Sequence, residues 1–123
     1  MTANALFDTV LALLFAETWE RNDYPNFLPV LNLFLQETYE LNNGLRRRRG
    51  AEALSAAPTV QELDQELTYE EEIVCLLLPY GIAGRLAVQE NPSLGANYVN
   101  KYEFERENLA LRSAEEGIVD TYG

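Results

Sequence analysis

The amino-acid sequence predicts an all-α protein: a bundle of about four helices with a long loop over residues 46–67 and an extended C-terminal tail. Two observations lead to this prediction. Apolar residues recur at the 3.6-residue spacing of an amphipathic helix. The stretches that carry this spacing begin at capping residues or are bounded by prolines and glycines. With 123 residues, of which 47 % are hydrophobic and 24 % charged, the chain has the size and composition of one folded domain.

The first predicted helix runs from about residue 5 to residue 20, with Asn4 as its cap. It carries two apolar rows side by side, a wider face than one partner helix needs. Either this helix is central in the bundle or one row packs against another subunit, and the central position is favoured because interior helices are common. The rows are Leu6, Val10, Leu13 and Leu14, and Phe7, Leu11, Phe15 and Trp19.

A second helix is predicted over residues 27–47, because Tyr24-Pro25 breaks the chain and Asn26 can cap a helix that begins at the next residue. Gly44 either loosens its last turn or ends it there. A loop follows, and within it residues 60–67 fit either a short helical turn or an extended arm. The apolar face of the second helix comprises Phe27, Leu31, Phe34, Thr38, Leu41 and Leu45, and the opposite face is marked by Asn32, Gln36, Glu40 and Asn43.

The third predicted helix begins near Tyr69, where Thr68 and Glu71 have the spacing of a capping box. Residues 73–78 are continuously apolar and are expected to be core. Pro79 lacks an N–H group and clashes with the preceding turn, so the helix should kink or restart there. Gly81 and Gly84, with neighbouring alanines, give the rest of this helix a surface that another backbone can approach closely.

The fourth predicted helix starts at Asn91-Pro92, a cap followed by proline in the first turn, and ends at Glu116. Gly117 is expected to terminate it. This divides the chain into a helical domain, residues 1–116, and a C-terminal tail, residues 117–123. The tail carries three apolar side chains, Ile118, Val119 and Tyr122.

The chain is strongly acidic, with 20 Asp and Glu, 9 Lys and Arg, and a formal net charge of −11. This charge argues against a general binder of nucleic acid or anionic membranes, because phosphates would be repelled. The longest apolar stretch, residues 73–84, is shorter than the roughly 20 residues of a membrane-spanning helix. The N-terminus also lacks the basic region of a signal peptide. We therefore expect a soluble protein of a reducing compartment with no membrane contact.

The residue types argue against an enzyme. The absence of histidine removes Ser–His–Asp and Cys–His catalysis and every histidine-containing zinc site. Cys75 is the only cysteine, and its apolar neighbours predict a buried structural thiol rather than a nucleophile. No Gly-rich phosphate loop is present. We expect no catalytic residue, no cofactor and no metal.

One basic cluster stands out in this acidic chain: Arg46, Arg47, Arg48 and Arg49. It is either a solvated helix end, where arginine suits the helix dipole, or a contact with an acidic surface of another subunit or a partner protein. Four consecutive arginines in a chain of net charge −11 favour the contact. Nucleic-acid phosphate is the weaker third alternative, because no basic field surrounds the cluster.

The stretch from Glu71 to Leu109, EEIVCLLLPYGIAGRLAVQENPSLGANYVNKYEFERENL, resembles the C-terminal half of the head–tail connector (adaptor) proteins of tailed bacteriophages. Those proteins have an acidic, apolar helix that leads into an L-P-x-G-[LI]-A-x-x-L run, then an Asn-Pro helix start and a pair of aromatic residues. The N-terminal half agrees only in its organisation. The matching residues are Leu78, Pro79, Gly81, Ile82, Ala83, Leu86, Asn91, Pro92, Tyr98 and Tyr102.

The resemblance implies a structural protein of the virion that is assembled in the host bacterial cytoplasm. Such adaptors form a dodecameric ring beneath the portal protein, extend the DNA channel and join the head to a neck or tail completion protein. DNA passes through the lumen without specific binding, which an acidic wall would favour. The C-terminal segment of such proteins docks on the portal, and this implies that role for Ile118, Val119 and Tyr122.

An alternative function is an acidic DNA mimic that inhibits a DNA-binding enzyme. The crowding of 14 acids into residues 51–123 favours it. Arg46–Arg49 and the large apolar helix faces argue against it.

Overall fold

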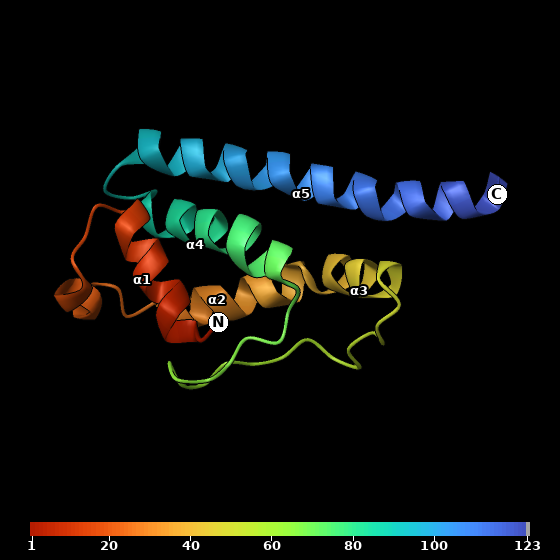
Figure 1. Ribbon diagram of the computed structural model, residues 1–123. Coiled ribbons are helices and arrows are strands. Elements are labelled where there is room, and N and C mark those ends of the chain that lie inside the picture. Colours follow the sequence, from red (N-terminus) through yellow and green to blue (C-terminus); the bar gives the residue numbers. More distant parts are fainter. Residues whose placement is uncertain (123) are drawn as a thin grey trace.

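The computed structural model describes the backbone of residues 1–122 and the side chains of residues 1–113. The all-α prediction is confirmed: within the described residues, the only strand-like pairing is an isolated bridge between Thr2 and Glu66. Helix α5 forms one outer layer, α4 lies beneath it, and α1 and α2 pack on α4 (Figure 1). The elements are α1 (Ala3–Leu13), the 3₁₀ helix η1 (Thr18–Asp23), α2 (Phe27–Glu37), α3 (Tyr39–Arg48), the π-helix η2 (Ile73–Leu77), α4 (Leu78–Ala87) and α5 (Pro92–Tyr122).

The favoured interpretation of the two apolar rows, a central first helix, is wrong: α4 contacts α1, α2 and α5, whereas α1 packs on α4 and keeps one side exposed. The predicted end of α1 near residue 20 is also wrong. It ends at Leu13, and its cap is Thr2 rather than Asn4. Phe15 adopts a left-handed backbone with φ of 59°. The Ala16 N–H then donates to the Leu11 carbonyl at 2.9 Å, and the Phe15 N–H to the Ala12 carbonyl at 3.1 Å. These two bonds form a Schellman motif, which stops the helix.

The second predicted helix is divided into α2 and α3 at Thr38. The Thr38 side chain is fully buried, and its hydroxyl donates to the Phe34 carbonyl at 2.7 Å. Such a bond back to the preceding turn competes with the backbone ladder and bends helices. Gly44 does not end the segment, since α3 continues to Arg48.

Two asparagines that the sequence pattern places on the face opposite the apolar one, Asn32 and Asn43, fasten the long loop to α2 and α3. The Asn32 amide accepts from the Val60 N–H at 2.8 Å and donates to the Val60 carbonyl at 2.9 Å. Asn43 makes the same pair of bonds with Leu54, at 2.8 and 3.1 Å. Each amide thus satisfies both backbone groups of one loop residue, as a neighbouring strand would.

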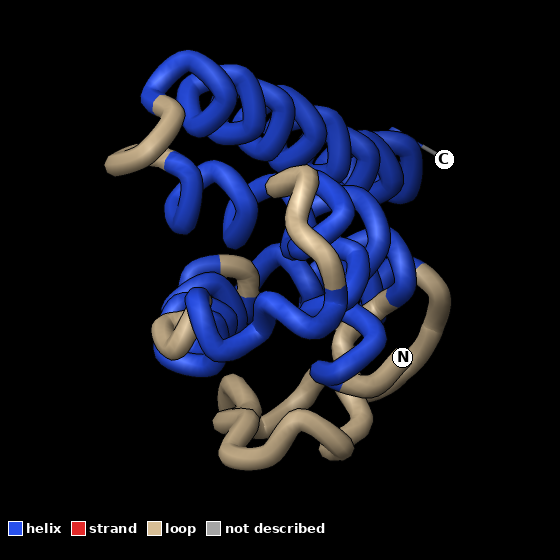
Figure 2. The backbone as a smooth tube through the Cα atoms, turned by 90° about the vertical axis from the view of Figure 1, so that its left-hand side faces the viewer, coloured by secondary structure: helices blue, strands red, loops and turns tan. Residues whose placement is uncertain are grey.

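The loop covers the face of the bundle that lies opposite α5 (Figure 2). Its last part, residues 60–67, is an arm with one hydrogen-bonded turn, in which the Gln65 N–H donates to the Glu62 carbonyl at 3.2 Å. Backbone bonds pair it with the start of the chain: the Asn4 N–H donates to the Leu63 carbonyl at 2.7 Å, and the Leu67 N–H donates to the Met1 carbonyl at 2.9 Å. The buried Asn42 side chain then accepts the Glu70 N–H at 2.7 Å. The Glu70 carbonyl accepts from the N–H groups of Ile73 and Val74, at 3.0 and 3.1 Å, so the helix begins at Glu71 and not near Tyr69.

The predicted restart at Pro79 coincides with a change of helix type. The π-turn of η2 comes directly before it, with the Leu78 N–H bonded to the Ile73 carbonyl five residues earlier, and α4 follows. The wider turn accommodates a residue that has no N–H and crowds the preceding turn. The prediction of a buried Cys75 is wrong: Cys75 and Leu76 are exposed, because one helix cannot bury all its sides at the edge of a bundle.

Glycines bring α4 and α5 into close contact. A Cβ atom on Gly84 would lie 3.0 Å from Val99 Cγ2 and 3.2 Å from the Gly95 carbonyl oxygen, and one on Gly81 would lie 2.8 Å from the Phe34 ring. The small-residue surface of α4 is therefore filled within the chain.

Helix α5 begins as predicted, with the Leu94 N–H donating to Asn91 Oδ1 at 3.2 Å. The prediction that Gly117 ends it and opens an extended tail is wrong, since the helix continues to Tyr122. A glycine inside a helix costs only about 1 kcal/mol relative to alanine, so helix-favouring neighbours can carry the helix through it. The side chains of Ile118, Val119 and Tyr122 lie outside the described residues, so their docking role stays a prediction.

Candidate functional site

The four consecutive arginines lie at the end of the bundle where α3 stops (Figure 1). Two of them are held within the chain by Glu70, whose side chain is about one-tenth exposed. Arg49 donates to both Glu70 oxygens, with Nη2 to Oε2 at 3.1 Å, and Arg46 Nη1 lies 3.5 Å from Oε2. For Arg46 and Arg49, the predicted acidic partner is thus a residue of their own chain.

This pairing shifts the titration of Glu70. The hydrogen bond from Arg49 holds the pKa of the Glu70 carboxyl below its ordinary value, against the opposing effect of burial. The same hydrogen bond raises the pKa of the Arg49 guanidinium. The ion pair ties the end of the long loop to the end of α3.

A Glu70→Gln substitution should reduce the free energy of unfolding by about 1 kcal/mol at neutral pH, because it removes a charge-assisted bond at a partly solvated site. Since the folded pKa is lowered, this contribution is present above the unfolded value of about 4.3 and is lost as the pH falls through the folded pKa. Urea titrations from pH 7 to pH 3 should show that the free energies of unfolding of the wild-type and Glu70→Gln proteins converge at low pH. Glu71→Gln, at the exposed neighbour, is the control, and an equal loss there would show that Glu70 has no special role.

Positive charge remains at this end of the molecule. Arg47 is exposed, and no ion pair joins it to another described residue. Beside it is a hollow of about 220 Å³ with three arginines and two glutamates in its wall. We call the two exposed arginines Arg47 and Arg112 the basic end. The hollow is lined by Leu45, Arg48, Arg49, Glu70, Glu72 and Arg112.

The opposite end of the bundle presents two large aromatic side chains to solvent. Phe15, directly after α1, is 83 % exposed, and Trp19, in η1, is 78 % exposed. Both were placed in the second apolar row of the first helix by the sequence pattern. The early end of α1 turns them away from the core, so they are not part of the bundle interior.

Carboxylates gather beside these aromatic residues. Burial and the negative charges of Glu90, Glu20 and Asp23 raise the pKa of the Tyr24 phenol. We call Phe15, Trp19, Asp23 and Glu90 the acidic corner. Next to it lies a hollow of about 340 Å³, lined by Leu14, Phe15, Tyr24, Leu86, Ala87, Glu90, Asn91 and Leu94.

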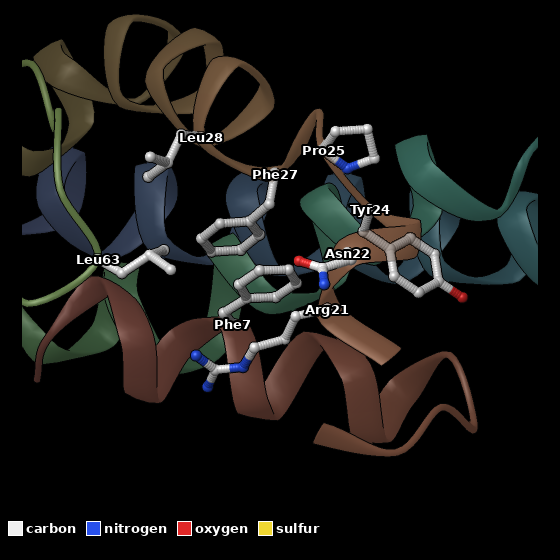
Figure 3. Close-up of a pocket in the computed structure, with 8 residues that line it drawn as sticks. All are labelled: Phe7, Arg21, Asn22, Tyr24, Pro25, Phe27, Leu28 and Leu63. Carbon is white, nitrogen blue, oxygen red and sulfur yellow. The ribbon is translucent and has the colours of Figure 1, made fainter. Parts of the chain in front are cut away.

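Arg21 holds η1, and with it Trp19, against α1. Its guanidinium pairs with Asn4 and Asp8 and lies 5.2 Å from the centre of the Phe7 ring. Phe7 in turn stacks on Phe27, with ring centres 4.0 Å apart (Figure 3). These contacts form one wall of a third hollow, of about 300 Å³, which separates η1 from the arm of the long loop. The acidic corner is therefore presented from an anchored segment.

A Phe15→Gly substitution should raise the free energy of unfolding by about 1 kcal/mol, because an L-residue in the left-handed region is strained and glycine is the preferred residue at this position of a helix end. Little packing is lost, since the side chain is exposed. Phe104→Gly, at an exposed phenylalanine inside α5, should lower it by a similar amount. Thermal unfolding of both variants tests the opposite signs, and a destabilised Phe15→Gly protein would contradict the strain argument.

Among the described residues, no three His, Cys, Asp or Glu side chains come together in a way that could hold a metal ion. No helix in the described part of the chain has the length and apolar character needed to cross a bilayer.

Neither the intrachain role of Glu70 nor the acidic corner was predicted from the sequence. The spacing of Glu17 and Glu20, which form a capping box at η1, was the available signal for a new helix start there. No local signal pairs Glu70 with arginines 21 and 24 residues earlier in the chain.

Comparison with known proteins adds no relative: no protein-family model, no curated protein sequence and no solved structure matches this chain.

Proposed function

We propose that this chain is a structural subunit of the head–tail connector of a tailed bacteriophage. In this role it forms a ring, with twelve copies the expected number, beneath the portal protein. The ring extends the DNA channel and joins the head to a neck or tail completion protein. No catalytic step and no cofactor are part of the proposal.

The observation that carries the proposal is the α4–α5 hairpin. All the residues that resemble the phage adaptors lie in it, and several have a packing role there. Gly81 makes room for Phe34 and Tyr102, Asn91 caps α5, and the Tyr98 hydroxyl donates to the Leu13 carbonyl at 2.6 Å. The resemblance thus falls on residues that build one supersecondary unit, and not on a scattered set of positions.

Charge supports the same role. A channel that must pass DNA without retaining it benefits from walls that repel phosphate, and the chain has a net charge of −11. The exposed aromatic residues and the basic end supply surfaces that fit protein partners. These features favour an assembly component over a binder of nucleic acid.

The C-terminal end of α5 is the part of the chain that we propose for docking on the portal, through Ile118, Val119 and Tyr122. Helix α5 extends past the end of α3, beyond the rest of the bundle (Figure 1). An amphipathic helix can lie in a groove between portal subunits, and repetition around the ring would make weak single contacts strong together.

The test is reconstitution with the purified portal protein encoded in the same genome, followed by electron microscopy. The expected result is an added ring below the portal with the chain present in stoichiometric amount. Truncation after Glu116 should abolish attachment. So should the full-length variant with alanine at Ile118, Val119 and Tyr122, which keeps the length of the helix and removes only the apolar side chains.

A portal that leaves the chain unbound would overturn the proposal. If a bait experiment instead recovers a DNA-binding enzyme whose activity the chain inhibits, the chain is the acidic DNA mimic that its charge also allows. Attachment that survives the alanine variant would move the docking role to another surface while leaving the connector function intact.

A further inference from the structure

We infer that copies of this chain associate head to tail, with the acidic corner of one copy docked on the basic end of the next. The inference rests on the proposed ring and names the partner of both surfaces, a second copy of this chain. Three observations support it: the opposite charges of the two ends, their positions in the fold, and the exposed aromatic side chains.

The two surfaces lie at opposite ends of the bundle. The acidic corner is formed where α1 ends, at η1 and at the turn between α4 and α5, whereas the basic end is formed where α3 stops (Figure 1). One copy cannot bring its own two ends together. A contact between them therefore joins two copies through unlike surfaces, and such contacts generate rings when the rotation closes.

The surfaces are complementary in chemistry. Asp23 and Glu90 are exposed at the corner, and the hollow beside it is lined by Glu90 together with Phe15 and Tyr24. Arg47 and Arg112 are exposed at the other end. Phe15 and Trp19 offer aromatic faces over which a guanidinium group can stack. Tryptophan and arginine are also the residue types most enriched at the energetic centres of protein interfaces.

The same charges disfavour the symmetric alternatives. Two acidic corners placed face to face would repel each other, and so would two basic ends. A strained left-handed phenylalanine at the corner, where glycine would be easier to accommodate, is explained if its exposed ring is needed for a contact. The second copy is thus the partner that the charges and the aromatic residues fit together.

Charge reversal provides the first test. Asp23→Arg with Glu90→Arg reverses the corner, and Arg47→Glu with Arg112→Glu reverses the opposite end. All four side chains are exposed, so each double variant should fold, with circular dichroism as the check. Each should weaken self-association at least tenfold at low salt, measured by sedimentation. The quadruple variant, with both ends reversed, should recover most of the loss.

Disulfide trapping provides the second test, because it also detects weak association. In a Cys75→Ser chain, Asn22→Cys at the corner and Ala51→Cys beyond the basic end should give an oxidised ladder of oligomers. The control chain combines Ala51→Cys with Asn97→Cys, at an exposed site on α5, and should give no ladder. Trp19→Ala, added to the first pair, should reduce trapping severalfold without loss of helix content.

The outcomes separate this inference from the proposed function. Suppose that the chain forms a ring on the portal, but that trapping gives no ladder and the quadruple variant recovers no association. This result overturns head-to-tail contact through these ends and leaves the connector function standing. A ladder and charge recovery without portal binding support the contact and contradict the function. A two-fold dimer in place of a ladder also overturns the inference.

Discussion

Replacing Gly84 by leucine is expected to lower the free energy of unfolding by about 3 kcal/mol and to separate α5 from α4. At this crossing a Cβ atom would meet backbone as well as side chain: the Val99 nitrogen at 3.1 Å and the Gly95 carbonyl oxygen at 3.2 Å. Backbone atoms of two packed helices cannot rotate aside as a side chain can. The helices must therefore move apart, and packing along both is lost.

Chemical denaturation measures this effect, and Ala96→Leu is the matched control. Ala96 is exposed on α5, next to Gly95, so the same side chain there enters solvent and should change stability by less than about 0.5 kcal/mol. A Gly84→Leu protein as stable as the control would show that the two helices do not approach each other this closely. If the proposed connector function holds, this variant should also fail to attach to a portal, because its α4–α5 unit is disrupted.

An Asn43→Asp substitution is expected to lower the free energy of unfolding by about 2 kcal/mol. It should also release the long loop from α3. The carboxylate can still accept the Leu54 N–H, but it cannot donate to the Leu54 carbonyl, and it places a negative charge against that oxygen. The same change at Asn32 acts on Val60. The two sites share no partner, so their effects should add. The free energy of unfolding of the double variant should be lower by about 4 kcal/mol.

Hydrogen exchange distinguishes a released loop from a globally weakened fold. The amides of Leu54 and Val60 should lose protection, whereas those in the centre of α4 should keep theirs as long as the protein remains folded. Asn97→Asp, at an exposed site on α5, should be nearly neutral. If Asn43→Asp is equally neutral, the loop is held by its apolar contacts alone.

Local sequence signals located the helices well where the signal and its effect lie within one turn. Asn91-Pro92 starts α5, the Tyr24-Pro25 pair precedes α2, and the change of helix type falls at Pro79. Caps and prolines act on hydrogen bonds three to five residues away, so their consequences can be read without knowledge of the fold. The all-α class followed from these signals together with the apolar spacing.

The contacts that were not predicted from the sequence depend on partners distant in the chain. Asn43 bonds to a residue 11 positions away, and Asn32 to one 28 positions away. The helix pattern alone places both asparagines on the face opposite the apolar one. Only the path of the loop makes them interior anchors, and the same path brings Glu70 to the arginines.

For this protein, then, the sequence alone determined an acidic, histidine-free helical bundle and the starts of α2 and α5, because composition and capping are local properties. The tertiary structure decided which surfaces are already occupied. The glycines of α4 are covered by α5, two of the four arginines are paired with Glu70, and Phe15 and Trp19 are turned outward. These outcomes depend on which segments meet in space, and packing between distant segments has no signature within any single stretch of the chain.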